Sequence, residues 1–162
     1  MILALFAFII IIYVILIFNQ LVFLDNITKN AKVQVDIKLK LRNDLLPLLI
    51  SIVKKYSAYE KSVFKEVTNL RNGKNISNSL KQLFVNVESY PKLKADKSFL
   101  RLQFEITELE SNIAFKRQFY NDSVNKYNNL AMSFPSNIVA KIFRYGLKKS
   151  FVNDSEFGGI KF

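Results

Sequence analysis

Residues 1–24 read MILALFAFIIIIYVILIFNQLVFL, and this stretch decides the fold. Its residues 2–18 carry no charge, and the hydroxyl of Tyr13 is their one polar side-chain group. A helix rising about 1.5 Å per residue needs roughly 20 mostly apolar residues to cross a hydrocarbon core about 30 Å thick. The stretch therefore predicts a membrane-spanning anchor at residues 1–24. With no basic residue before it and no small-residue cleavage site at its end, it is not typical of a cleaved signal peptide.

The composition excludes several kinds of chemistry. The 162 residues include no His, no Cys and no Trp. The chain can therefore form no disulfide, thiol nucleophile, imidazole acid–base pair or His/Cys metal site. No glycine-rich phosphate loop or nucleophile elbow is present either. We expect no enzymatic activity, no catalytic residues, no cofactor and no metal.

The charge balance is strongly basic, with 24 Lys and Arg against 13 Asp and Glu and a net charge of +11. These residues are spread along the chain, so we expect no nucleic-acid partner; a basic surface near a bilayer favours anionic headgroups instead. No Lys or Arg precedes the apolar stretch, and five follow it closely. The positive-inside rule then predicts an outside N-terminus and a cytoplasmic bundle. The five are Lys29, Lys32, Lys38, Lys40 and Arg42.

A long helix is predicted over residues 25–70, bent at Pro47, with its continuity into the anchor left open. Apolar residues recur there at spacings of three and four, which is typical of a helix and not of a strand. The main stripe includes Val33, Ile37, Leu41, Leu45, Leu48, Ile52, Val63, Val67 and Leu70. A second set widens it, as expected for a helix with two neighbours: Val35, Leu39, Leu46, Leu49 and Val53.

The rest of the chain also reads as helix. Gly73 lies in a turn, and Ser79 and Gln82 have capping-box spacing at the start of a short helix. A heptad pattern then predicts a helix over residues 96–134, with Asp96 as its cap. Its principal apolar positions are Phe99, Ile106, Ile113, Tyr120, Tyr127 and Phe134.

A last short helix is predicted at residues 137–145, capped by Ser136 and stopped by Gly146. We favour the interpretation in which it packs on the bundle with solvated basic side chains. The alternative places it in the headgroup layer with its basic residues toward lipid. Those residues are Lys141, Arg144, Lys148 and Lys149. The predicted organisation is an all-α fold with an anchor at 1–24, an antiparallel bundle of long helices at 25–146 and a tail at 147–162.

Three stretches resemble the LemA family, a bacterial group that includes MamQ-like members. They are VQVDIKLKLRNDLLPLL at residues 33–49, ESYPKLKA at 88–95 and ESNIAFKRQFYNDSVNKYN at 110–128. The resemblance extends over nearly the whole chain. It implies one N-terminal membrane helix, a helical bundle and a bacterial cell membrane location. It implies no defined biochemical role.

Polar residues in these stretches are the candidate site. We interpret them as a structural network that fixes helix register: Glu88, Tyr90, Glu110, Asn112, Arg117, Tyr120, Asn121, Tyr127 and Asn128. A metal site made of Glu105, Glu108 and Glu110 is disfavoured, because Glu110 lies nearly opposite Glu108 on a helix and no Glu-x-x-His is present.

The sequence thus predicts a membrane-anchored, non-enzymatic scaffold of the LemA type that binds a protein partner or a second copy of itself. The alternative function is a membrane-surface protein that binds anionic lipid or shapes the bilayer through its basic face.

Overall fold

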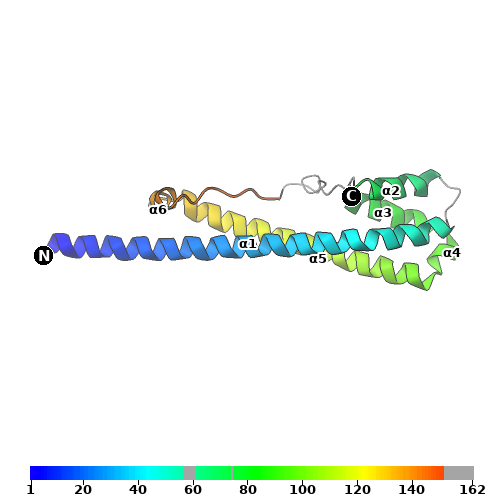
Figure 1. The fold of residues 1–162 in the computed structure, drawn as a ribbon, viewed down its shortest axis with the longest axis horizontal. Coiled ribbons are helices and arrows are strands. Elements are labelled where there is room, and N and C mark those ends of the chain that lie inside the picture. Colours follow the sequence, from blue (N-terminus) through cyan, green and yellow to red (C-terminus); the bar gives the residue numbers. More distant parts are fainter. Residues whose placement is uncertain (57–60, 74, 152–162) are drawn as a thin grey trace. The chain divides into compact units, whose positions relative to one another are not determined.

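The computed structural model describes residues 1–56, 61–73 and 75–151, and every regular element among them is a helix (Figure 1). This part of the chain contains no strand, in agreement with the predicted all-α fold. The helices are α1 (Ile2–Tyr56), α2 (Lys61–Arg71), α3 (Ile76–Val87), α4 (Pro91–Lys94), α5 (Lys97–Met132) and α6 (Ser136–Ile142).

The apolar stretch and the helix that follows it form one continuous element, α1, which runs through Pro47. The predicted extension of this helix to Leu70 is wrong, because α1 ends at Tyr56 and α2 begins at Lys61. Val63 and Val67 of α2 belong to the same buried cluster as Val53 of α1. The two helices therefore pack on one another within unit 2. Residues 57–60 lie outside the described part of the chain.

The beginning of α3 differs from the prediction as well. Ser79 is buried inside the helix and is not its cap. The helix starts one turn earlier, after Asn75, whose φ of 45° is left-handed. Asn tolerates this conformation better than most residues. The earlier start lets Ile76 pack against the buried cluster of α1 and α2.

The chain divides into two compact units. Among the described residues, unit 1 comprises Met1–Val35 and Lys116–Phe151, and unit 2 comprises Asp36–Phe115. Helices α1 and α5 contribute to both. The core of unit 2 joins α1, α2, α3, α4 and α5 through Leu46, Leu49, Val53, Val63, Val67, Leu70, Leu80, Leu83, Val87, Leu93, Phe99 and Ile106.

Unit 1 has a smaller core in which the second half of the apolar stretch takes part. Leu21 is fully buried with Tyr127 and Ala131 of α5 and with Val139 and Ala140 of α6. Around this cluster pack Val14, Ile17, Phe18, Leu24, Leu130 and Tyr145. All of residues 2–13 remain exposed. The apolar stretch therefore consists of a free first half and a second half that is packed on one side.

The long helix α5 begins and packs as predicted. One carboxylate oxygen of Asp96 accepts hydrogen bonds from the backbone N–H groups of Ser98 and Phe99, at 2.8 and 3.0 Å, which makes it the N-terminal cap. Five of the six principal heptad positions are buried. The sixth, Phe134, lies beyond the end of the helix and is exposed.

The end of α6 corrects two predictions. Ser136 is the first helical residue and not the cap, and its hydroxyl donates to the carbonyl of Leu130. Gly146 is not the stop signal, because α6 ends at Ile142. Arg144 has a left-handed φ of 58°, and the N–H of Tyr145 donates to the carbonyl of Ala140 at 2.8 Å. This is a Schellman termination with arginine at the position that glycine usually occupies.

Candidate functional site

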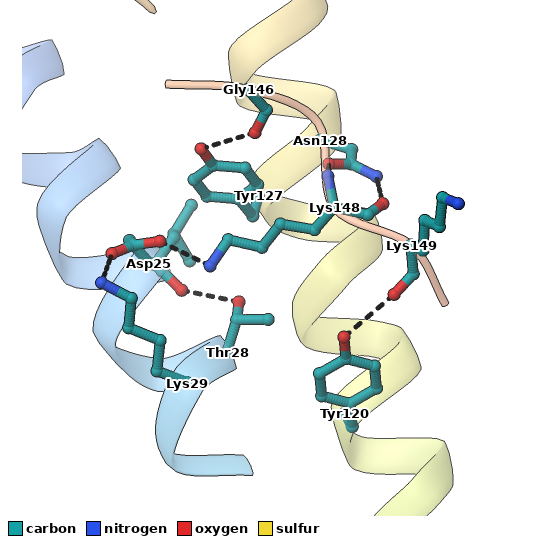
Figure 2. A network of polar contacts seen from close by, with 10 residues as sticks. Asp25, Thr28, Lys29, Tyr120, Tyr127, Asn128, Gly146, Lys148 and Lys149 are labelled. Carbon is teal, nitrogen blue, oxygen red and sulfur yellow. Dashed lines mark hydrogen bonds and ion pairs between the residues drawn. The ribbon is translucent and has the colours of Figure 1, made fainter. Parts of the chain in front are cut away.

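Helix α5 carries a repeated Tyr-Asn pair, at residues 120–121 and again at 127–128. Seven residues make nearly two helical turns, so both pairs lie on one face about 10 Å apart. The non-helical residues 146–151 run beside this face (Figure 2). We call the four side chains the Tyr-Asn repeat.

The second pair of the Tyr-Asn repeat binds the start of this segment. Tyr127 donates its hydroxyl to the carbonyl of Gly146 at 3.0 Å (Figure 2). Asn128 donates Nδ2 to the carbonyl of Lys148 at 2.8 Å, and its Oδ1 accepts the Lys148 N–H at 2.9 Å. One asparagine side chain thus satisfies both backbone groups of one residue.

The first pair does the same three residues further along. Tyr120 donates to the carbonyl of Lys149 at 2.9 Å. Asn121 donates Nδ2 to the carbonyl of Phe151 at 3.1 Å and accepts the Phe151 N–H at 2.8 Å. Three extended residues advance about 10 Å, which matches the separation of the two pairs on the helix. Because three residues of the segment and seven residues of the helix cover the same distance, the same set of hydrogen bonds forms twice.

An ion-pair cluster ties the segment to α1 within unit 1. Asp25 accepts from Lys148 at 2.5 Å and from Lys29 at 2.7 Å (Figure 2). The Lys148 ammonium also lies 4.7 Å from the centre of the Tyr127 ring, within the range of a cation–π contact. Burial alone would raise the pKa of the Asp25 carboxyl, but the hydrogen bonds from Lys148 and Lys29 outweigh it and lower that pKa below its usual value.

A second polar cluster lies in unit 2 and joins α1, α3 and α5. Arg42 donates Nη1 to Glu110 at 3.2 Å and to the Ser77 hydroxyl at 3.3 Å. Ser77 donates in turn to the other Glu110 oxygen at 2.6 Å. The Arg42 side chain is only 8% exposed and that of Glu110 is 25% exposed. The cluster therefore works as a largely buried tie between three helices.

The predicted network is thus divided. The four side chains of the Tyr-Asn repeat do act together. Their hydrogen bonds go to the backbone of the segment after α6, whereas the prediction was that they fix the register between helices. Glu110 pairs with Arg42 and Ser77 in unit 2.

The remaining predicted residues lie elsewhere. Glu88 pairs with Lys94 on the surface. Asn112 donates to the carbonyl of Glu108 one turn earlier in α5. Tyr90 packs at the edge of the unit 2 core, and Arg117 is half-buried on α5, one turn before the first pair of the Tyr-Asn repeat.

The acidic residues considered for a metal are engaged separately. Glu105 accepts from Arg101 at 3.0 Å, while Glu110 belongs to the buried tie. Within residues 1–56, 61–73 and 75–151, no three His, Cys, Asp or Glu residues gather closely enough to hold a metal ion.

The four predicted basic residues also separate. Lys141, Arg144 and Lys149 are exposed. Lys148 is not available to lipid, because its ammonium is bound to Asp25 and only 19% of its side chain is exposed. The sequence analysis did not predict a role for Asp25, because an acidic residue just after an apolar stretch ordinarily marks the point where a helix enters water.

Each unit leaves apolar side chains uncovered. In unit 2 they include Ile37, Leu41 and Leu48 of α1 and Leu100, Phe104 and Phe115 of α5. In unit 1, beyond the apolar stretch of residues 1–24, a group lies around α6. It contains Met132, Phe134, Ile138, Ile142, Phe143 and Leu147.

Comparison with known proteins agrees with the features of the sequence and the fold. Of the described helices, only α1 is long and apolar enough to cross a membrane, and its most apolar window has no buried residue. The sequence model of the LemA family matches residues 31–157. No curated protein matches the chain.

Proposed function

Because the chain belongs to the LemA family, we propose that it is a membrane-anchored, non-enzymatic scaffold that binds a second copy of itself through α1. The observation that carries this proposal is the uncovered apolar face of α1 in unit 2. The anchor is the apolar stretch at the start of the same helix. Its bundle lies on the cytoplasmic side, as the basic residues that follow the anchor indicate.

Helix α1 has two apolar faces in unit 2. The buried one follows a heptad spacing through Leu39, Arg42, Leu46, Leu49 and Val53. The other contains Ile37, Leu41 and Leu48, which are 58%, 44% and 54% exposed. At about 100° per residue these three fall within an arc of roughly 40°. Three large apolar residues on one exposed face favour a partner helix.

A second copy of the chain is the partner that anchoring in the same membrane favours. Two anchors that enter one membrane in the same direction present this face in the same orientation and at the same number of residues from the bilayer. Tethering also raises the effective concentration of one face for the other. Asp44 lies about 20° outside this arc and is exposed, so two copies would bring like charges together. A polar residue in such a seam lowers its stability while it fixes register.

The absence of enzymatic activity is supported by the composition and by the engagement of the polar residues. The chain has neither His nor Cys. The carboxylates of Asp25 and Glu110 are bound to lysine and arginine side chains, which gives them structural roles.

Cross-linking in native membranes tests the proposed face. The chain has no cysteine, so Leu41→Cys introduces a unique thiol. The matched control is Lys40→Cys, which is exposed but about 100° around the helix. We expect a disulfide-linked dimer with Leu41→Cys under mild oxidation and little dimer with Lys40→Cys. Equal cross-linking of both, or of neither, contradicts the proposed face.

A further inference from the structure

We infer that α6 and the turns on either side of it enter the lipid at the edge of the membrane that α1 crosses. The inference rests on the proposed span of α1. The surface that contacts lipid consists of the exposed apolar residues around α6 together with Lys141 and Arg144. The ligand class is a phospholipid bilayer, with acyl chains against the apolar side chains and phosphates against the basic ones.

The first step is a length argument. Residues 2–13 are all exposed and none of them packs on the buried cluster of unit 1, and as a helix they measure only about 18 Å. A hydrocarbon core is about 30 Å thick. The span must therefore continue to about Leu21. This places residues 14–21, which are packed on one side by the bundle, inside the hydrocarbon.

The second step is the position of α6 along α1. The ring of Phe18 lies 4.6 Å from that of Phe143 and 6.1 Å from that of Tyr145. Leu21 shares its buried cluster with Val139 and Ala140 of α6. All of these contacts lie within unit 1. The helix α6 is therefore at the depth of the last third of the span, so α1 cannot cross the membrane while α6 stays clear of it.

The third step is the chemistry of the surface that α6 presents. Phe134 is 81% exposed and Ile142 is 69% exposed, and neither is expected to face water without a partner. Exposed side chains nearby are Met132, Ile138, Phe143 and Leu147. Lys141 and Arg144 are long enough to place their charges among phosphates while their stems stay in the apolar layer. Helices of this kind lie at the boundary between headgroups and acyl chains.

The last step concerns the level along α1 at which the polar region of unit 1 begins. Immediately after Leu24, Asp25 binds Lys29 and Lys148, and the Tyr-Asn repeat follows on α5. The apolar cluster around Leu21 thus lies before this level, and the ion pairs of Asp25 and the Tyr-Asn repeat lie at or after it. The change from one to the other coincides with the end of the span and defines the water side of the interface.

Tryptophan fluorescence with bromine-labelled lipids tests the inference on the full chain. The protein has no Trp, so Ile142→Trp and Phe134→Trp each create a single reporter. The vesicles contain phosphatidylcholine and phosphatidylglycerol with bromine near the carbonyl end of the acyl chains. The matched control is Phe119→Trp, an exposed aromatic position of unit 1 about 18 Å further along α5 from Ala131. A fourth variant, Phe8→Trp, reports on the span itself.

We expect bromine to reduce the fluorescence of Ile142→Trp and Phe134→Trp severalfold and to leave Phe119→Trp unchanged. If Phe8→Trp is quenched while both α6 reporters are not, the span stands and this inference is wrong. If Phe8→Trp is not quenched either, the proposed span itself fails. Burial of the α6 reporters without quenching by lipid would assign the surface to a second protein copy and would also overturn the inference.

Discussion

At the scale of single residues, the end of α6 shows a backbone conformation that is unusual for the residue that adopts it. Arg144 ends α6 in a left-handed conformation, which is unfavourable for any residue with a Cβ atom. The sequence indicated Gly146 as the stop because glycine is the usual signal. An arginine carries no such signal, so this end could not have been located without the structure.

Replacing Arg144 by glycine should stabilise the protein by about 1 kcal/mol, because glycine adopts a positive φ without strain. Denaturant unfolding of the detergent-solubilised protein, followed by circular dichroism, measures the change. Arg144→Ala is the matched control, since it removes the same charge but keeps a Cβ atom. A gain of equal size in both variants would trace the effect to charge and contradict the conformational explanation.

The second pair of the Tyr-Asn repeat offers another residue-scale prediction. Asn128→Ala removes both hydrogen bonds to Lys148, at about 1 kcal/mol each, and should raise local opening of residues 146–151 about 30-fold. Hydrogen exchange of the Lys148 amide measures it. Asn125→Ala, at an exposed position of the same helix, should leave the exchange unchanged. Unaltered exchange in Asn128→Ala would mean that other contacts hold the segment.

The Asp25 cluster predicts a pH dependence. Its carboxyl pKa is lower in the folded protein than the unfolded value of about 3.9, so its contribution is present at neutral pH and is lost as the pH falls below about 4. Asp25→Asn should therefore lower the melting temperature at pH 7, and the difference from the natural protein should shrink below pH 4. A constant difference across this range would exclude the ion pairs as its cause.

At the scale of elements, α1 shows why periodicity predicts a helix better than it predicts which face is buried. The main apolar stripe of the sequence includes Ile37, Leu41 and Leu48, yet these residues are exposed. The buried seam passes through Arg42, which the sequence analysis counted only among the basic residues after the apolar stretch. Its partners Ser77 and Glu110 lie 35 and 68 residues away, so no local pattern indicates the pairing.

This tie between α1, α3 and α5 can be tested with two variants. Arg42→Leu should destabilise the protein by roughly 3 kcal/mol, because it leaves the carboxylate of Glu110 without its main partner. Adding Glu110→Leu should recover most of the loss, since an apolar pair of similar volume can replace a buried ion pair. Melting temperatures in detergent measure both. A double variant no more stable than Arg42→Leu alone would contradict the explanation by an unpaired charge.

At the scale of the whole molecule, the periodicity of residues 25–70 and 96–134 was sufficient to predict an all-α fold, and the apolar stretch was sufficient to predict one helix long and apolar enough to cross a membrane. The three stretches at residues 33–49, 88–95 and 110–128 indicated the family. The separation of the predicted helix over residues 25–70 into α1 and α2 was not predictable, because the apolar stripe continues from Ile52 to Val63 at helical spacing. Nor could the sequence indicate that only residues 2–13 of the stretch stay free. That division follows from long-range packing of Leu21 with α5 and α6.

The orientation of the whole chain is the corresponding prediction. Ser89 is exposed in the turn after α3, and Ser89→Cys gives the chain a unique thiol there. A membrane-impermeant maleimide should label this thiol only after cells are lysed, because the basic residues after the anchor favour the cytoplasmic side. The impermeant reagent is compared with a permeant one in the same cells. Labelling of intact cells by the impermeant reagent would reverse the assigned orientation.

The Tyr-Asn repeat has an evolutionary consequence. The hydrogen bonds of its four side chains all go to peptide N–H and C=O groups of residues 146–151, which every non-proline amino acid supplies in the same geometry. Two side chains of the segment also make contacts: Lys148 binds Asp25, and the ring of Phe151 lies 4.6 Å from that of Tyr120. Most substitutions at Leu147, Lys149 or Ser150 should therefore be nearly neutral for docking, whereas proline at Lys148 or Phe151 should not be. Selection at this site acts on the four residues of α5, and the segment that they hold is open to divergence.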